Sequence, residues 1–159
     1  MEILQHSLKK TDLDALTAFQ AKVWGILTSL LKDLLIDKLS NESTIAKGLG
    51  IDVFLRLKNS DFVIYMSITE DSLYINSMYF DFYIYPETEV EKIELILEEL
   101  LQGKYLVILG YGSKERLVYK ELVFENNKLQ EFNEKRKIGF LTKKIKNEKR
   151  VNGVMLMNG

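Results

Sequence analysis

Residues 51–85 read IDVFLRLKNSDFVIYMSITEDSLYINSMYFDFYIY, and this stretch decides the fold. Apolar residues fill every second position in 51–57 and again in 62–68, which is typical of strands with one buried face. Short polar runs at 59–61 and 70–72 predict tight turns. Residues 73–85 predict a third strand that is long and aromatic. Short turns between successive strands indicate an antiparallel meander.

A second helix is predicted directly after the meander. Pro86 is the only proline, and it suits a helix start because the first turn does not need its missing N–H. Thr88 and Glu91 have the spacing of a capping box. Apolar residues at 90, 93, 97, 100 and 101 share one helical face, and Gly103 suits the left-handed residue that ends a helix.

The segment before the meander predicts a long helix that begins near Thr11 and Asp12, whose side chains suit an N-cap. Apolar residues recur at steps of three and four from 13 to 34, and Trp24 widens the stripe. A wide stripe suggests burial by the sheet on one side and by a second copy on the other. A homodimer through this helix is therefore one expectation, with Trp24 exposed when only one side packs. The polar run 40–43 ends the helix, and residues 48–50 read as a connector.

Two further strands are expected at 105–109 and 116–125, joined by a turn at 110–113. Residues 129–132 continue the sheet in this interpretation, and residues 151–154 form a last hairpin. The order is α-β-β-β-α-β-β in a single domain, 1–159. The predicted fold class is α+β, an antiparallel meander sheet with a long N-terminal helix and a second helix packed on it. Residues 134–150 are expected to form a basic, flexible C-terminal segment.

The composition favours binding over catalysis. The chain has no cysteine, and its single histidine is His6, so thiol nucleophiles, thiolate metal sites and histidine clusters are excluded. Carboxylates at 70, 81, 115 and 121 lie on or beside strands, but no spacing marks two of them as an acid/base pair. We therefore expect no enzyme activity, no cofactor and no metal site.

The net charge of −1 hides an asymmetry along the chain. Residues 1–127 hold 13 basic and 20 acidic residues, whereas residues 128–159 hold 9 and 3. Residues 1–10 lack the apolar core of a signal peptide, and four charges interrupt the apolar stretch 26–39. These patterns predict a cytoplasmic protein that does not enter a membrane.

Two surfaces are candidates for binding a protein. The aromatic strand presents Tyr79, Asp81, Tyr83 and Tyr85 on one face, and tyrosine is frequent at binding hot spots. The second helix carries Glu91, Glu94 and Glu98, which could steer a basic partner. The alternatives are a half-exposed structural strand and an ordinary solvated helix face.

A basic surface supports the competing hypothesis of nucleic-acid binding. Its candidate residues are Lys135, Arg136, Lys137, Lys143, Lys144 and Lys146. No RNA-binding signature accompanies them. The Gly110-Tyr111-Gly112 run lacks the third glycine and the helix of a dinucleotide loop, so it reads as a hairpin turn.

The leading hypothesis is a non-enzymatic protein-binding module. It is pictured as a small bacterial cytoplasmic inhibitor of the immunity type, which occludes a partner such as a basic toxin or nuclease. The alternatives are a nucleic-acid-associated protein that uses the basic segment and an α+β domain that binds a small ligand between sheet and helices.

Overall fold

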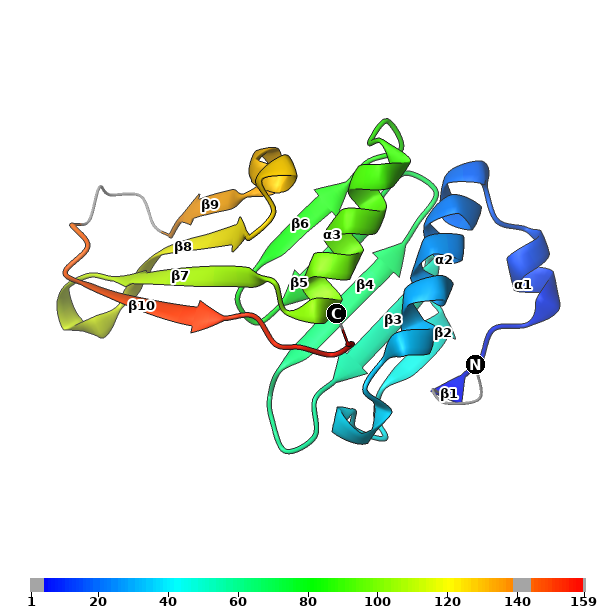
Figure 1. The fold of residues 1–159 in the computed structure, drawn as a ribbon, viewed down its shortest axis with the longest axis horizontal. Coiled ribbons are helices and arrows are strands. Elements are labelled where there is room, and N and C mark those ends of the chain that lie inside the picture. Colours follow the sequence, from blue (N-terminus) through cyan, green and yellow to red (C-terminus); the bar gives the residue numbers. More distant parts are fainter. Residues whose placement is uncertain (1–4, 139–143, 159) are drawn as a thin grey trace.

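The computed structural model describes residues 5–138 and 144–158. Within these residues the fold is α+β, with a six-stranded sheet, a four-stranded sheet and helices (Figure 1). The strands of the first sheet lie in chain order, and β1 pairs in parallel with β2 while the other pairs are antiparallel. These strands are β1 (Gln5–His6), β2 (Thr44–Lys47), β3 (Ile51–Arg56), β4 (Val63–Ile68), β5 (Leu73–Ser77) and β6 (Asp81–Ile84).

Helices α2 (Ala18–Leu30) and α3 (Val90–Gln102) lie side by side on one face of the first sheet (Figure 1). The apolar positions of the alternating strands point toward these helices and are buried. The centre of this core consists of Val23, Leu27, Val53, Leu55, Ile64, Met66, Ile75, Ile93 and Leu97. None of the helices in the described part of the chain has the length and apolar character needed to cross a membrane.

The prediction of one long N-terminal helix is wrong in its length. The structure has a short α1 (Lys10–Asp14) and then α2, which begins with its own capping box. The Thr17 hydroxyl accepts a hydrogen bond from the Gln20 N–H at 3.3 Å, and the Gln20 side chain accepts one from the Thr17 N–H at 3.0 Å. These two bonds define a separate helix start at Thr17.

The same helix also ends earlier than its apolar pattern suggests. After Leu30 the chain continues in two 3₁₀ turns, η1 (Leu31–Asp33) and η2 (Ile36–Lys38). The Leu35 N–H donates to the Leu156 carbonyl at 2.7 Å, so contact with the C-terminal residues replaces a helical bond. Tertiary pairing therefore overrides local helix propensity at this point.

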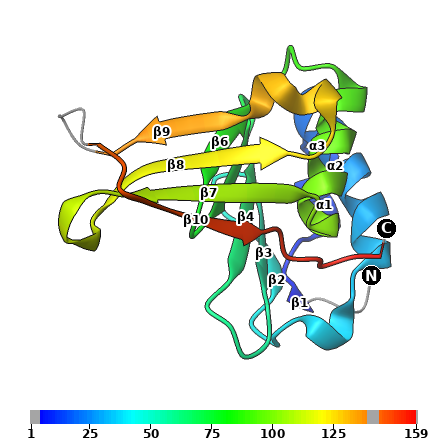
Figure 2. The same cartoon turned by 60° about the vertical axis from the view of Figure 1, so that its left-hand side comes forward.

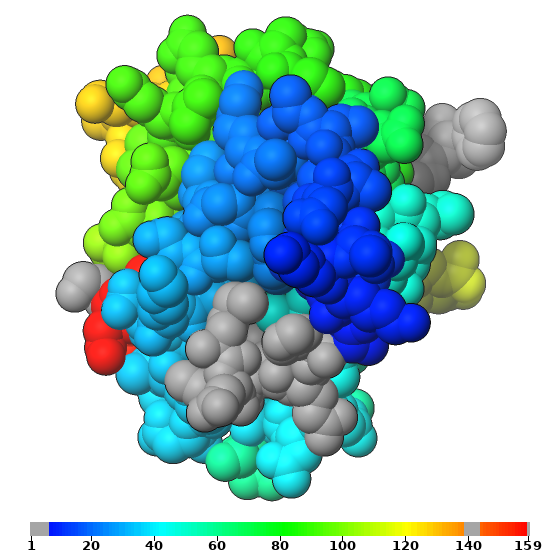
Figure 3. Space-filling model, turned by 90° about the vertical axis from the view of Figure 1, so that its right-hand side faces the viewer, coloured from blue at the N-terminus to red at the C-terminus, as the bar shows by residue number. Residues whose placement is uncertain are grey.

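Trp24 packs into the hydrophobic core of its own chain and is only 9% exposed. The exposed positions of α2 carry small or polar residues, namely Ala18, Ala21, Lys22, Gly25 and Ser29. Figure 3 shows the side of the molecule on which α1 and α2 form much of the surface. The homodimer expectation thus loses the exposed tryptophan from which it was argued.

The predicted meander is confirmed, but residues 73–85 form two strands and not one. Residues 78–80 turn between β5 and β6, and the Ser77 N–H donates to the Phe80 carbonyl at 2.8 Å. The prediction also lacked a strand before residue 51: residues 44–47 form β2, which pairs with β3, and the predicted connector at 48–50 is the tip between these two strands.

The ends of α3 match the prediction at one end only. Gly103 follows the helix with a φ of 71°, the left-handed conformation that glycine adopts without a steric penalty. The predicted capping box is wrong: Glu89 occupies the N-cap and makes no side-chain cap bond. The Thr88 N–H instead donates to the Tyr85 carbonyl at 3.0 Å, in the turn around Pro86.

The second sheet projects away from the helices (Figure 2). Its order is β10-β7-β8-β9, with β7 (Tyr105–Tyr111), β8 (Leu117–Phe124), β9 (Glu134–Lys137) and β10 (Asn147–Asn152). Both ends of the basic segment are therefore strands. A 3₁₀ turn, η3 (Ser113–Glu115), lies between β7 and β8, and residues 129–132 belong to the 3₁₀ segment η4 (Asn127–Phe132), where a strand was expected. The last hairpin expected at 151–154 is replaced by pairing of β10 with β7.

Four aromatic rings join the two sheets. Tyr105 meets Phe80 edge to face at 5.4 Å between ring centroids, and Phe124 meets Phe82 in the same way at 6.2 Å. Burial raises the pKa of Tyr105 to about 12, so its hydroxyl stays protonated.

The C-terminal residues return to the core after β10. Leu156 and Met157 are buried, and the N–H groups of both donate to the Leu101 carbonyl at the end of α3. Met157 also forms a bridge with Leu34. The last described residues therefore hold α2, α3 and the second sheet together.

Replacing Leu156 with alanine should lower the free energy of unfolding by about 2–5 kcal/mol, because a fully buried leucine leaves a cavity. Urea unfolding followed by circular dichroism measures this change. Met155→Ala is the control, since Met155 is 45% exposed and should change stability by less than about 0.5 kcal/mol. Equal effects of the two variants would contradict the role given to Leu156.

Candidate interaction surface

The face of the first sheet that α2 and α3 leave uncovered is built by the strand register. Side chains of paired residues stand next to one another on the same face. One row across the sheet consists of Thr44, Phe54, Tyr65, Asn76 and Asp81. The next row consists of Ala46, Asp52, Ser67, Tyr74 and Tyr83. We call this surface the open face.

A tyrosine ladder, consisting of Tyr65, Tyr74, Tyr83 and Tyr85, crosses the open face. Tyr65 meets Tyr74 edge to face at 6.3 Å, and Tyr74 meets Tyr83 at 4.7 Å. Tyr83 and Tyr85 stack at 6.2 Å with an interplanar angle of 14°. Neighbouring rings thus restrict one another before any partner binds, while Tyr83 and Tyr85 remain about half exposed, at 51% and 50%.

Polar groups fix the ladder at its inner end. The Asn76 amide donates to the Tyr74 hydroxyl at 3.1 Å. Burial raises the pKa of Tyr65, and the nearby Asp52 carboxylate raises it further, while a contact with Ser67 lowers it. The Tyr65 hydroxyl is therefore protonated at neutral pH.

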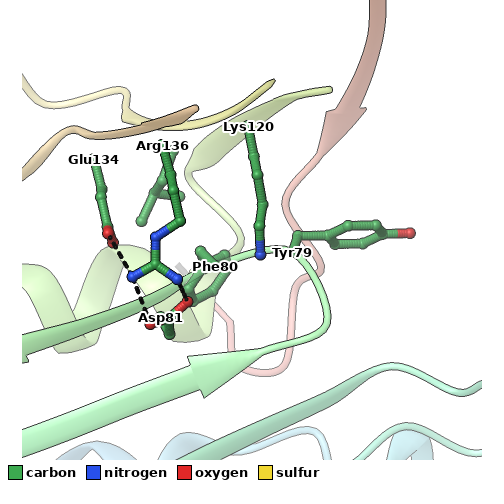
Figure 4. Close-up of a pocket in the computed structure, with 7 residues that line it drawn as sticks. Tyr79, Phe80, Asp81, Lys120, Glu134 and Arg136 are labelled. Carbon is green, nitrogen blue, oxygen red and sulfur yellow. Dashed lines mark hydrogen bonds and ion pairs between the residues drawn. The ribbon is translucent and has the colours of Figure 1, made fainter. Parts of the chain in front are cut away.

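Arg136 of β9 binds Asp81 of β6 with both ends of its guanidinium (Figure 4). The distances are 2.8 Å from Nη1 to Oδ1 and 3.0 Å from Nη2 to Oδ2. Glu134 lies 3.4 Å from Nη2, and burial raises the pKa of this carboxyl. The crevice around these residues encloses about 10 Å³, which holds one water molecule and no organic ligand.

The structure brings together three of the four predicted strand residues. Asp81 and Tyr83 stand on the open face, and Tyr85 extends the ladder beyond β6. Tyr79 lies in the turn at 78–80, where it is half-buried and packs on the core. Its ring points away from Arg136 in Figure 4.

The prediction missed Phe54, Tyr65 and Tyr74 as members of the same face. One long strand would place Tyr74 and Tyr83 on opposite faces, since nine positions separate them. In the hairpin they are direct partners. The sequence did contain a signal of this turn. Aliphatic residues stand at the odd positions 73 and 75, whereas phenylalanine and isoleucine stand at the even positions 80, 82 and 84.

The acidic residues predicted to steer a partner lie on the helix side of the molecule. Glu91, Glu94 and Glu98 line a groove of about 520 Å³ beside α3, together with Leu95 and Lys128. Since α3 covers the other face of the sheet, this groove and the tyrosine ladder do not form one surface.

Two of the predicted basic residues already have acidic partners. Arg136 pairs with Asp81, and the ammonium group of Lys135 lies 3.1 Å from Glu121. Lys137, Lys144 and Lys146 are exposed. Lys143 lies outside the described residues. Arg136, a residue of the nucleic-acid hypothesis, thus forms an ion pair with Asp81, a residue of the protein-binding hypothesis.

Metal ligands were also sought among residues 5–138 and 144–158. No three histidine, aspartate or glutamate side chains of this part of the chain lie close enough together to hold a metal ion. Comparisons of the chain with models of protein families, with curated proteins and with solved structures found no match.

Glu99 is the buried acid of the acidic helix, at 7% exposure, and it accepts a hydrogen bond from the Asn126 N–H at 3.1 Å. Burial raises the pKa of Glu99 above its ordinary value of 4.5, although the Asn126 bond lowers it. The folded protein therefore holds this proton more tightly than the unfolded chain, and stability from this group is lost as the pH rises through the folded pKa.

Glu99→Gln keeps the acceptor for Asn126 and removes the buried charge. We expect the variant to melt at a higher temperature than the parent at pH 7.5, with the difference shrinking toward pH 4. Thermal melts across this pH range measure the effect, and Glu94→Gln is the exposed control on the same helix. Parallel pH profiles for parent and E99Q would contradict the assignment.

Proposed function

We propose that this protein is a non-enzymatic module that binds another protein on its open face and works by occlusion, as an inhibitor of the immunity type would. The observation that carries the proposal is the tyrosine ladder on a sheet face that the described helices do not cover. Tyrosine combines a large rigid ring with a hydroxyl, and few rotamers are lost when it is buried in an interface.

The pre-arranged rings support a docking role over a purely structural one. Phe54, Tyr65 and Tyr74 are half-buried, and none of them belongs to the hydrophobic core behind the sheet. Two large side chains, Tyr83 and Tyr85, stay half exposed at the edge of the ladder. Aromatic residues at the centre of a contact with polar groups around them are typical of protein interfaces.

The second sheet gives the open face a boundary. The bidentate Arg136–Asp81 pair joins β9 to the edge strand β6, at one end of the row that contains Phe54 and Tyr65. A partner on the ladder would meet this edge as well. A partner that contacts both the ladder and β9 would bury more surface than a partner that contacts the ladder alone.

Aromatic rings on an open sheet can also stack nucleobases, but the charges here favour a protein. Nucleic-acid platforms combine rings with a positive groove. The rows of the open face carry Asp52 and Asp81, and Arg136 is occupied by Asp81. A polyanion would meet little uncompensated positive charge at this surface.

Loss of the outer rings should remove binding. We expect Tyr83→Ala with Tyr85→Ala to weaken the affinity for the partner at least about fivefold, the usual effect of truncating interface anchors. The partner is first captured on the tagged full-length protein from a lysate of the source cells, with and without nuclease, and is identified by mass spectrometry. Its affinity is then measured by biolayer interferometry.

Val90→Ala serves as the control, because Val90 is an apolar residue of α3 that is 42% exposed on the helix side. A stoichiometric partner that survives nuclease and binds V90A but not the double tyrosine variant would support the proposal. A partner that binds both variants equally would overturn it. Capture that disappears on nuclease treatment would favour the nucleic-acid alternative.

A further inference from the structure

Asp52 stands in the middle of the open face, and no described lysine or arginine forms an ion pair with it. It lies in β3 between Ala46 of β2 and Ser67 of β4, in the row that ends in Tyr74 and Tyr83. Its side chain is half-buried. Among residues 7–138 and 144–158, no lysine or arginine nitrogen lies within 4.0 Å of its carboxylate.

Several other charged residues on or beside this face are paired, whereas Lys120 lines the crevice around Asp81 and Arg136 and forms no ion pair with a described acidic residue. Asp81 binds Arg136, Arg56 binds Glu42, and Lys47 binds Asp12 at 2.6 Å. A half-buried charge loses part of its hydration and normally gains a partner in return. Of the two acids in the rows of the open face, Asp81 has an arginine partner, whereas Asp52 has no ion pair with a described lysine or arginine.

Small residues surround the Asp52 carboxylate. The Ser67 hydroxyl donates to Oδ1 at 2.6 Å, which leaves Oδ2 free of this bond. Oδ2 lies close to Gly48, and a Cβ added to Gly48 would lie 2.0 Å from Oδ2, so a larger residue there would displace the carboxylate. With Ala46 on β2, these residues form a low floor around the carboxylate.

The ladder forms the neighbouring wall. Tyr65 is the diagonal neighbour of Asp52 on β4, close enough for the carboxylate to raise the pKa of its hydroxyl. Tyr74 follows on β5 as the partner of Ser67. A carboxylate beside aromatic rings suits a guanidinium or an ammonium group, which gains a charge-assisted hydrogen bond from the first and cation–π contact from the second.

We propose that Asp52, with Tyr65 and Tyr74, captures an arginine or lysine side chain that the partner protein inserts into the open face. This inference rests on the proposed function, because it names the chemistry of the partner at the same surface. Residues 1–127 carry 20 acidic and 13 basic residues, and this negative net charge would attract a basic partner. Opposite charges also speed the encounter of the two proteins.

The test uses a defined probe in place of the unidentified partner. The full-length protein, labelled with ¹⁵N, is titrated with the blocked tripeptide acetyl-Gly-Arg-Gly-amide, and amide shifts are followed by NMR. The same peptide with citrulline in place of arginine is the neutral probe of matched shape. We expect the arginine peptide to shift the amides of Asp52, Tyr65, Ser67 and Tyr74, and the citrulline peptide to bind at least about fivefold more weakly.

Asp52→Asn should weaken arginine-peptide binding about fivefold and bring it level with the citrulline peptide. The asparagine oxygen still accepts from Ser67, so the fold is retained, and a melting curve verifies this. Asp33→Asn is the matched control: it removes the same charge at an exposed position in η1, after α2, and should leave peptide binding unchanged.

The outcomes separate this inference from the proposed function. Equal binding of the arginine and citrulline peptides, or unchanged binding by D52N, overturns cation capture and leaves the ladder as a docking surface. Absence of shifts at these four amides also overturns cation capture, and the double tyrosine variant still decides the proposed function. Larger shifts with an oligothymidine of eight nucleotides than with the arginine peptide would overturn cation capture in favour of nucleic acid.

Discussion

Two helices cover one face of the six-stranded sheet, and the rest of the structure depends on this constraint. Alternation makes one face of each strand apolar, and α2 and α3 supply the apolar stripes that bury it. No further helix of the described chain is available for the other face. That face must therefore tolerate water, and it does so with tyrosines, which combine an apolar ring with a hydroxyl group.

The second sheet packs against the edge strand β6 of the first sheet, and this contact pairs charged residues that are far apart in the sequence. Aromatic rings at Phe80, Phe82, Tyr105 and Phe124 bury the junction, and the chain after β10 returns to α3. As a result Arg136 reaches Asp81, although 55 positions separate them in the sequence. Two residues that support competing hypotheses when taken singly thus neutralise each other.

The distribution of charge gives the molecule two unlike sides. Acidic residues of α3 line a groove on the helix side, whereas the open face carries the Asp81–Arg136 pair and Asp52, which forms no ion pair with a described lysine or arginine. A surface with many like charges acts at long range and affects association rates. A single unpaired charge among ordered rings acts at contact distance and affects which side chain is accepted.

The sequence by itself determined the α+β class, the meander, α3 with its terminal Gly103, and the shared face of Tyr83 and Tyr85, because strand alternation and helix caps are local properties. Only the tertiary structure decided the break of the first helix, the turn at 78–80 and the strands β2, β9 and β10. It also decided that Tyr65 and Tyr74 join Tyr83, and that Asp81, unlike Asp52, has an ion-pair partner among the described residues. These features depend on strand register and on contacts between distant segments, which compete with local propensity and cannot be read from neighbouring residues.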